Sequence, residues 1–164
     1  MGVPEEIRAL VGELNASTSV LKRISEFYDV FEKKAGSKEQ SVENAIILSD
    51  VFVSYYTCLE TAFLRISQFF ENTLDSRRWH RDVLKKMTLT IPGIRNRVLS
   101  ASTYNNLEEL LRFRHFKRYY FEFDYDWDRL ELVRTKFLAA RKRVMEEIED
   151  YKDYLKTLAR EAEK

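Results

Sequence analysis

The chain has 164 residues, the size of one domain, and its 45% hydrophobic and 34% charged residues are enough to build a packed core. The 28 Lys and Arg nearly balance the 27 Asp and Glu, so a uniformly basic surface for nucleic acid is excluded and any basic site must be local. Only four Gly and two Pro are too few for a sheet with many tight turns, so the composition predicts an all-α fold.

The cysteine and histidine content points away from disulfides and metal sites. Cys58 has no second cysteine to pair with, which favours a reducing, cytoplasmic compartment. His80 and His115 are the two histidines, too few with one cysteine for a structural metal site. No apolar run approaches the ~20 residues of a membrane span, and the first residues do not resemble a secretion signal. We therefore expect a cytoplasmic protein with no metal, no cofactor and no membrane partner.

The first helix is predicted to begin at Pro4, because proline fits the first turn of a helix and two glutamates follow it. Apolar residues then recur at three- to four-residue spacing. The short polar side chains over 15–19 compete for the backbone, which leaves a kink or break open there. We expect a single domain over 1–164, with an N-terminal helix over 1–36 and the main bundle over 37–162.

The second helix is predicted from about residue 38 to about residue 72, with a capping box formed by Ser37 and Gln40. Cys58 lies within it, and we interpret this residue as a small buried hydrophobe rather than a reactive thiol. The apolar residues cover more than one face, so this helix should lie at the centre of a bundle. They are Ile46, Ile47, Val51, Val53, Tyr55, Leu59, Ala62, Phe63, Ile66, Phe69 and Phe70.

Three further helices are predicted in the second half of the chain. A short helix over about 77–89 is followed by a loop at 90–93, which contains a Pro-Gly pair. A fourth helix starts within 100–103 and runs to about residue 121. Asp126 is the expected N-cap of a fifth helix over about 127–162. The fold class is therefore all-α, an up-and-down four-helix bundle core with an extra short helix.

The positive charge is concentrated near the middle of the chain. Region 77–118 holds eleven Lys and Arg but three Asp and Glu. Two interpretations remain open, a local anion-binding site and an ordinary solvated helix surface. The eleven cations are Arg77, Arg78, Arg81, Lys85, Lys86, Arg95, Arg97, Arg112, Arg114, Lys117 and Arg118.

The fourth helix carries the more specific signal. Leu107, Leu111, Arg114 and Arg118 follow one another at spacings of four, three and four, so they share one face of the helix. A core-facing stripe thus begins as leucine and continues as arginine. Two cations in that position are unfavourable unless an anion, a carboxylate or a water-filled cleft meets them. The alternatives are ion pairs with a neighbouring helix and a phosphate-facing cleft, and we favour the cleft.

Several short segments, in the same order and spacing over about 45–155, together resemble the HepT-like branch of the HEPN superfamily. These segments are WHRDVL at 79–84, IPGIR at 91–95, VLS at 98–100, LRFRHFKRYYF at 111–121 and FDYDW at 123–127.

The resemblance implies a helical bundle, usually a homodimer, in a cytoplasmic prokaryotic toxin–antitoxin or phage-defence setting. It implies a metal-independent ribonuclease whose usual partner is a small nucleotidyltransferase antitoxin. The family's signature is Arg, four residues, His, one residue, Tyr, and two protomers bring their signatures together. The Arg and His act on the 2′-OH and the scissile phosphate of RNA, and the Tyr is a target for adenylylation.

This chain departs from that signature at two of its three positions. The Arg falls on Arg114, but the His falls on Tyr119 and the modified Tyr falls on Phe121. A phenol with a pKa near ~10 is a poor general base at neutral pH compared with an imidazole near ~6.5. Phenylalanine has no hydroxyl to accept a nucleotide. His115 is an alternative base, although it lies one residue from Arg114 rather than five.

We expect the remaining basic residues to contact the phosphates of RNA or of a nucleotide, namely Arg81, Arg112, Lys117 and Arg118. Three functions stay open: a ribonuclease that still cuts RNA, a catalytically silent HEPN module, and a helical adaptor whose arginines only form ion pairs. The silent module would bind RNA, a nucleotide or the nucleotidyltransferase. The two substitutions favour the silent module over the ribonuclease, and the arginine stripe argues against the adaptor.

Overall fold

The computed structural model describes residues 2–34, 39–71, 79–119 and 123–164, and within them the backbone forms five helices and no strand. The all-α fold class is therefore confirmed. The helices are α1 (Val3–Lys33), α2 (Val42–Glu71), α3 (Trp79–Lys86), α4 (Ala101–Tyr119) and α5 (Trp127–Glu161).

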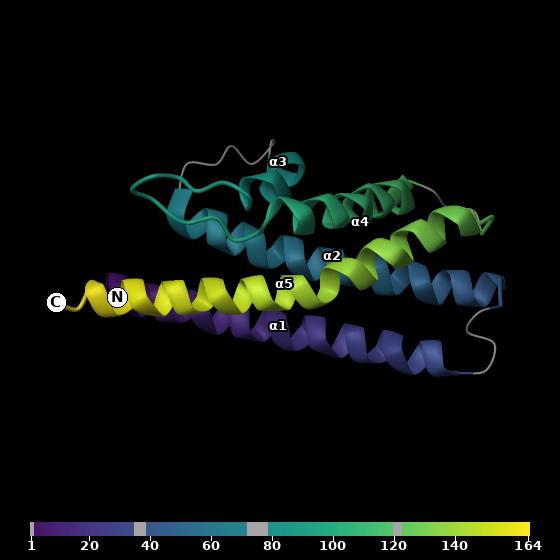
Figure 1. Cartoon of the computed structure of the whole chain (residues 1–164), viewed down its shortest axis with the longest axis horizontal. Coiled ribbons are helices and arrows are strands. Elements are labelled where there is room, and N and C mark those ends of the chain that lie inside the picture. The colour runs from purple at the N-terminus through teal and green to yellow at the C-terminus, as the bar shows by residue number, and fades with distance from the viewer. Residues whose placement is uncertain (1, 35–38, 72–78, 120–122) are drawn as a thin grey trace.

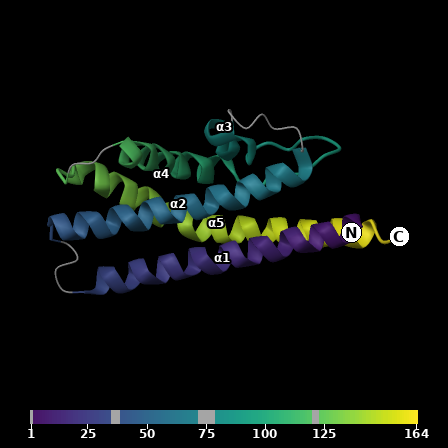
Figure 2. The ribbon, with the colours of Figure 1, turned by 180° about the vertical axis from the view of Figure 1, so that it is seen from behind.

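The four long helices alternate in direction along the long axis of the molecule (Figure 1). Helix α1 packs against α5 and α2, and α4 packs against α5 and α2. Figure 2 shows the same arrangement from behind, with the short α3 over the C-terminal end of α2. The two chain ends lie at one end of the bundle, and the far end holds the start of α2 and the end of α4.

Helix α1 is continuous through residues 15–19, where the short polar side chains made a kink or a break possible. The Thr18 hydroxyl donates to the backbone carbonyl of Asn15 at 3.0 Å, and the Asn15 side chain accepts from Lys152 at 2.9 Å. Leu14 and Leu21 are buried on either side. Packing against α5 thus outweighs the weak local helix propensity.

Helix α2 begins at Val42 rather than near residue 38, because Ser41 supplies the cap. The Ser41 hydroxyl accepts the backbone N–H of Asn44 at 3.1 Å. The predicted capping box includes Ser37, which lies outside the described residues.

Among the described helices, α2 is the one whose length and apolar composition match a membrane span, but 56% of its apolar window is buried inside the bundle. It contacts the other four helices, so its predicted central position is confirmed.

The predicted cap of the fifth helix is confirmed. Asp126 accepts backbone N–H groups from Asp128 at 3.0 Å and Arg129 at 3.3 Å. Further along α5, the ring of Phe137 lies 5.0 Å from the rings of both Tyr28 and Tyr55. These aromatic contacts join α1, α2 and α5 in one core.

The segment between α3 and α4 is ordered by a tight turn. Helix α3 ends at Lys86, earlier than the predicted end near residue 89. The predicted loop is confirmed, and Gly93 adopts a φ of 73°, which favours glycine. The backbone N–H of Ile91 donates to the carbonyl of Arg95 at 2.8 Å, which closes the turn.

Candidate anion-binding groove

A groove of about 440 Å³ runs between α2 and α4, at the end of the bundle away from the chain termini. Its α2 wall is a single helical face, because its residues recur at spacings of three and four. Its α4 wall carries three cations within little more than one helical turn. The lining residues are Ile46, Ser49, Asp50, Val53 and Thr57 of α2, Arg114, Lys117 and Arg118 of α4, and Tyr125 before α5.

Arg114 occupies the inner part of this groove and is held by a carboxylate from α2. Its two terminal nitrogens donate to the two carboxylate oxygens of Glu60 at 2.5 and 2.8 Å. The side chains of Arg114 and Glu60 are 11% and 6% exposed. The guanidinium also lies 5.0 Å from the centre of the Tyr56 ring. Arg114 therefore forms the interhelical ion pair that was the less favoured alternative, and it also lines a groove; that this groove faces phosphate stays a prediction.

Lys117 and Arg118 extend the cationic wall outwards. The Lys117 ammonium donates to the Tyr125 hydroxyl at 2.8 Å and lies 4.7 Å from the centre of that ring. Arg118 is exposed and has no ion-pair partner among the residues that the structure describes. The prediction that Arg118 continues the core-facing stripe is wrong, because Arg118 is exposed and Phe113 is the last buried residue among the α4 side chains that the structure describes.

His115 and Arg112 do not line the groove. Both are exposed, and Arg112 pairs with Glu109 at 2.8 Å and Glu108 at 3.4 Å on its own helix. Consecutive residues on a helix point in different directions, so His115 faces a different side of α4 from Arg114. The groove thus brings together Arg114, Lys117 and Arg118 of the predicted site residues.

The other predicted site residues stay predictions. Tyr119 ends α4, and Arg81 and His80 lie in α3, but the structure does not describe these three side chains. Phe121 lies outside the described residues.

Burial controls the protonation of the groove's aromatic neighbour. Tyr56 is fully buried beside the ion pair, and this burial, with the nearby Glu60 carboxylate, raises the pKa of its hydroxyl above the ordinary value. The phenol therefore stays neutral around Arg114 at physiological pH. The sequence left an ion pair with a neighbouring helix open but did not identify Glu60 as the partner, because an ion pair between helices leaves no local pattern.

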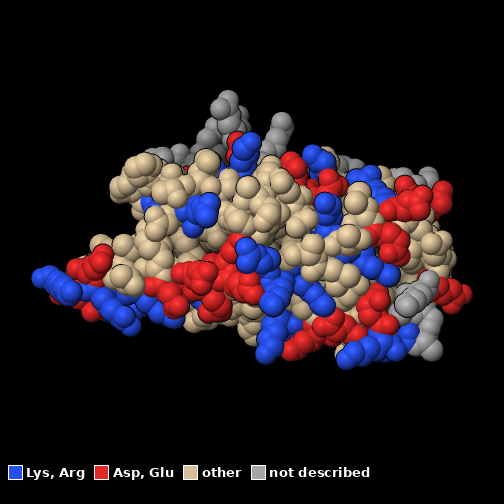
Figure 3. Space-filling view, in the orientation of Figure 1, with Lys and Arg blue, Asp and Glu red and all other residues tan. Residues whose placement is uncertain are grey.

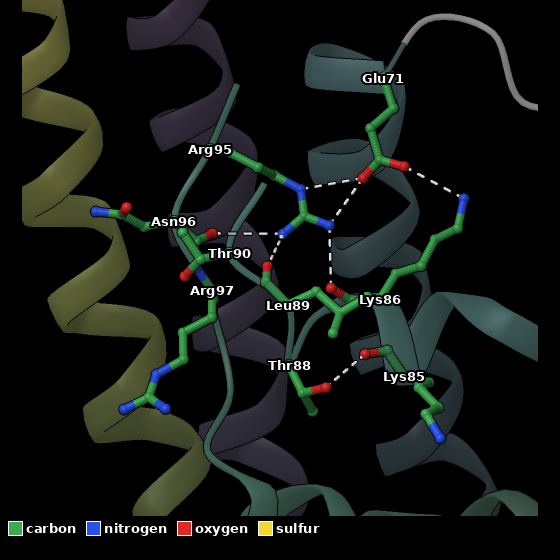
Figure 4. Close-up of polar contacts among 9 residues, drawn as sticks. All are labelled: Glu71, Lys85, Lys86, Thr88, Leu89, Thr90, Arg95, Asn96 and Arg97. Atoms are coloured by element: carbon green, nitrogen blue, oxygen red, sulfur yellow. Dashed lines mark hydrogen bonds and ion pairs between the residues drawn. The ribbon is translucent and has the colours of Figure 1, made fainter. Parts of the chain in front are cut away.

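A second polar cluster lies at the opposite end of the bundle and takes Arg95 out of the candidate cations (Figure 4). The side chain of Arg95 is 0% exposed and donates to one oxygen of Glu71 at 2.8 and 3.0 Å. It also donates to the backbone carbonyls of Lys86, Leu89 and Asn96 at 3.0 to 3.3 Å. Arg95 therefore fixes the loop before α4 rather than serving as a surface cation, and the sequence carried no sign of this.

The Glu71 carboxylate balances that buried guanidinium. Its burial alone would raise its pKa, but hydrogen bonds from Arg95 and Lys86 outweigh burial and hold the pKa below its ordinary value.

Elsewhere, Lys and Arg alternate with Asp and Glu along α1 and α5 on the face shown in Figure 3. The described part of the chain has no group of three His, Cys, Asp or Glu side chains suited to a metal ion.

Comparison with known proteins agrees with the sequence resemblance. A family model described as HepT-like protein matches residues 47–155, more than half of the chain. The match includes α3, α4, most of α2 and most of α5, and therefore every residue that lines the groove except Ile46. No curated protein and no solved structure matches the chain.

Proposed function

We propose that this chain, which belongs to the HepT-like protein family, binds RNA or a nucleotide in the groove between α2 and α4. The observation that supports this most strongly is the groove's α4 wall, with Arg114 held in place by Glu60 and Lys117 and Arg118 beside it. Arg118 can pair with a phosphate without first breaking an ion pair to a described residue. This argues against an adaptor whose arginines only form ion pairs.

The setting proposed for this activity is the one that the family implies. The protein would act in the cytoplasm of a prokaryote, as a homodimer, within a toxin–antitoxin or defence system. Light scattering on the purified protein tests the dimer, since a monomer at working concentration would contradict it.

Binding dominates over cleavage in this proposal. Metal-independent cleavage of RNA requires a base that takes the proton of the 2′-OH while its oxygen attacks phosphorus and the 5′-oxygen leaves. Tyr119 stands at the position of the family's His, and a phenol with a pKa near ~10 is poorly suited to that step. The negative charge of Glu60 also offsets the positive charge of Arg114. The net positive charge of the groove's α4 wall therefore comes from Lys117 and Arg118.

Fluorescence anisotropy with a labelled single-stranded RNA tests the binding step. We expect Arg118→Ala to weaken binding severalfold. The slope of the logarithm of the binding constant against the logarithm of the salt concentration should become shallower by about 0.7, the value for one phosphate contact on a single strand. Arg23→Ala removes an exposed arginine of α1 outside the groove, so it serves as the matched control. Equal loss in both variants, or no binding by the wild type at about 50 mM salt, would contradict the proposal.

Incubation with RNA in the presence of EDTA tests cleavage. Cleavage that is lost in a Glu60→Gln plus Arg114→Gln variant would identify a weakened ribonuclease, because this pair of changes leaves no lone buried charge. No cleavage by the wild type, with activity gained in Tyr119→His plus Phe121→Tyr, would identify a silent module.

The substitution of both motif residues also favours a second candidate function, a catalytically silent HEPN module that binds a small nucleotidyltransferase. Phe121 has no hydroxyl for such a partner to adenylylate, so the association would act by binding alone. Co-purification with a nucleotidyltransferase encoded beside this protein tests it. A partner that elutes separately from this chain at micromolar concentration would contradict this candidate.

A further inference from the structure

We propose that the groove selects guanine, through Asp50 and Ser49 of α2, while Lys117 and Arg118 hold the adjoining phosphate. This inference rests on the proposed function and names the nucleotide that the groove takes. The same chemistry is offered by a free guanine nucleotide and by a guanosine within single-stranded RNA.

The first argument for guanine is the position of Asp50. It is an exposed carboxylate on the α2 wall, opposite the cations, and it forms no ion pair with the residues that the structure describes. In a groove that bound phosphate alone, this negative charge would repel the ligand. A carboxylate accepts hydrogen bonds and donates none, and its two oxygens can receive two parallel N–H groups. Asp50 is therefore suited to the part of a nucleotide that donates hydrogen bonds, which is the base.

Ser49 is the second reason. It lines the same groove, is 2% exposed, and its hydroxyl has no hydrogen-bond partner among the described residues. A buried polar group without a partner is unfavourable, and a ligand that accepts a hydrogen bond from it would remove that cost. Ser49 and Asp50 both line the groove, so a donor and a double acceptor are present on its α2 wall.

The pattern of the two residues matches one base best. The Watson–Crick edge of guanine carries the O6 acceptor followed by the N1–H and N2–H donors, and unstacked bases are commonly read on this edge. Adenine presents one amino donor, and cytosine and uracil each present one donor on that edge. The hydroxyl of Ser49 would donate to O6, and Asp50 would accept from N1 and N2.

The rest of the groove suits a base and a phosphate together. Ile46 and Val53 provide apolar surface for the flat face of a base, and Tyr125 contributes an aromatic ring. The volume of about 440 Å³ lies within the range of roughly 300–1,000 Å³ that is typical of small-ligand sites. Lys117 and Arg118 are on the opposite wall, where the phosphate would lie.

Two sets of probes test the proposal by anisotropy and calorimetry: GMP, AMP, CMP and UMP, and the pentaribonucleotides UUGUU, UUAUU and UUUUU. We expect the guanine probe to bind about tenfold more tightly than the others, as for a bidentate contact to a base. We expect Asp50→Asn to reduce that preference to about twofold or less. Glu43→Gln, which removes an exposed carboxylate from the same helix outside the groove, should keep the full preference.

The outcomes separate this inference from the proposed function. A preference among the mononucleotides assigns the site to a free nucleotide, and one confined to the pentamers assigns it to RNA. Equal binding of all probes by the wild type, or uniformly tighter binding by Asp50→Asn, would overturn the guanine assignment and leave RNA binding intact. Failure of the wild type to bind any probe at low salt would overturn both. Circular dichroism confirms that each variant is folded, and a surface position such as Asp50 tolerates the change.

Discussion

Removal of Glu60 should destabilise the fold more than removal of any exposed carboxylate. In Glu60→Ala the Arg114 guanidinium, whose side chain is 11% exposed, loses both of its short hydrogen bonds. Breaking a buried ion pair by removing one partner costs about 3–5 kcal/mol. Arg114 also borders the groove and can recover some hydration there, so we expect the lower value, about 3 kcal/mol.

Urea and thermal unfolding followed by circular dichroism measure this loss. For a domain of this size, about 3 kcal/mol corresponds to a melting temperature lower by roughly 6–12 °C. Glu26→Ala is the matched control, because Glu26 belongs to an exposed pair with Lys22 at 3.9 Å and should change stability by less than about 0.5 kcal/mol.

A double-mutant cycle shows whether the loss comes from the ion pair. If it does, Glu60→Gln should cost much less when Arg114 is already glutamine than when it is arginine. A change below about 1 kcal/mol in Glu60→Ala, or the same cost in both backgrounds, would refute the claim that the carboxylate holds the guanidinium.

Three further predictions follow from the fold. Because the pKa of Glu71 is lowered in the folded state, its contribution to stability should be present above about pH 4.5 and lost as pH falls further, and Glu71→Gln should flatten this part of the urea-unfolding profile. Because burial raises the pKa of Tyr55 and Tyr56, both should stay un-ionised in the ultraviolet spectrum above about pH 10 until the protein unfolds, and stability should decline there. Asp126→Ala should cost about 1 kcal/mol through loss of the helix cap, whereas Asp124→Ala should not alter the melting temperature measurably.

The features that sequence predicts well here are those with local causes. Asp126 caps α5 because its own side chain reaches the backbone N–H groups two and three residues further on, and the Pro-Gly pair at 92–93 marks a loop by its backbone preferences. The unbroken α1 shows the limit of local reasoning, because burial against α5 overrides the polar stretch at 15–19. Propensity therefore predicts which helices form more reliably than it predicts their interruptions.

The candidate site was predictable on one wall and not on the other. The spacing of Arg114 and Arg118 identified α4, but their surroundings depend on residues that are distant in sequence. Glu60 is 54 residues from Arg114 in the sequence, and Asp50 is more distant from Arg114 than Glu60 is. Arg95 was counted among the cations of a possible basic surface, but in the structure backbone carbonyls and Glu71 enclose its side chain. Both depend on how the helices pack, which the order of residue types does not specify.

The position of the chain ends has a practical consequence. Both ends lie at one end of the bundle, where Arg8 of α1 forms an ion pair with Glu163, and the groove lies at the other end. A fluorophore, an affinity handle or a surface tether attached to either end would stand clear of an oligonucleotide in the groove. Immobilised protein should therefore remain fully competent in kinetic measurements of ligand capture.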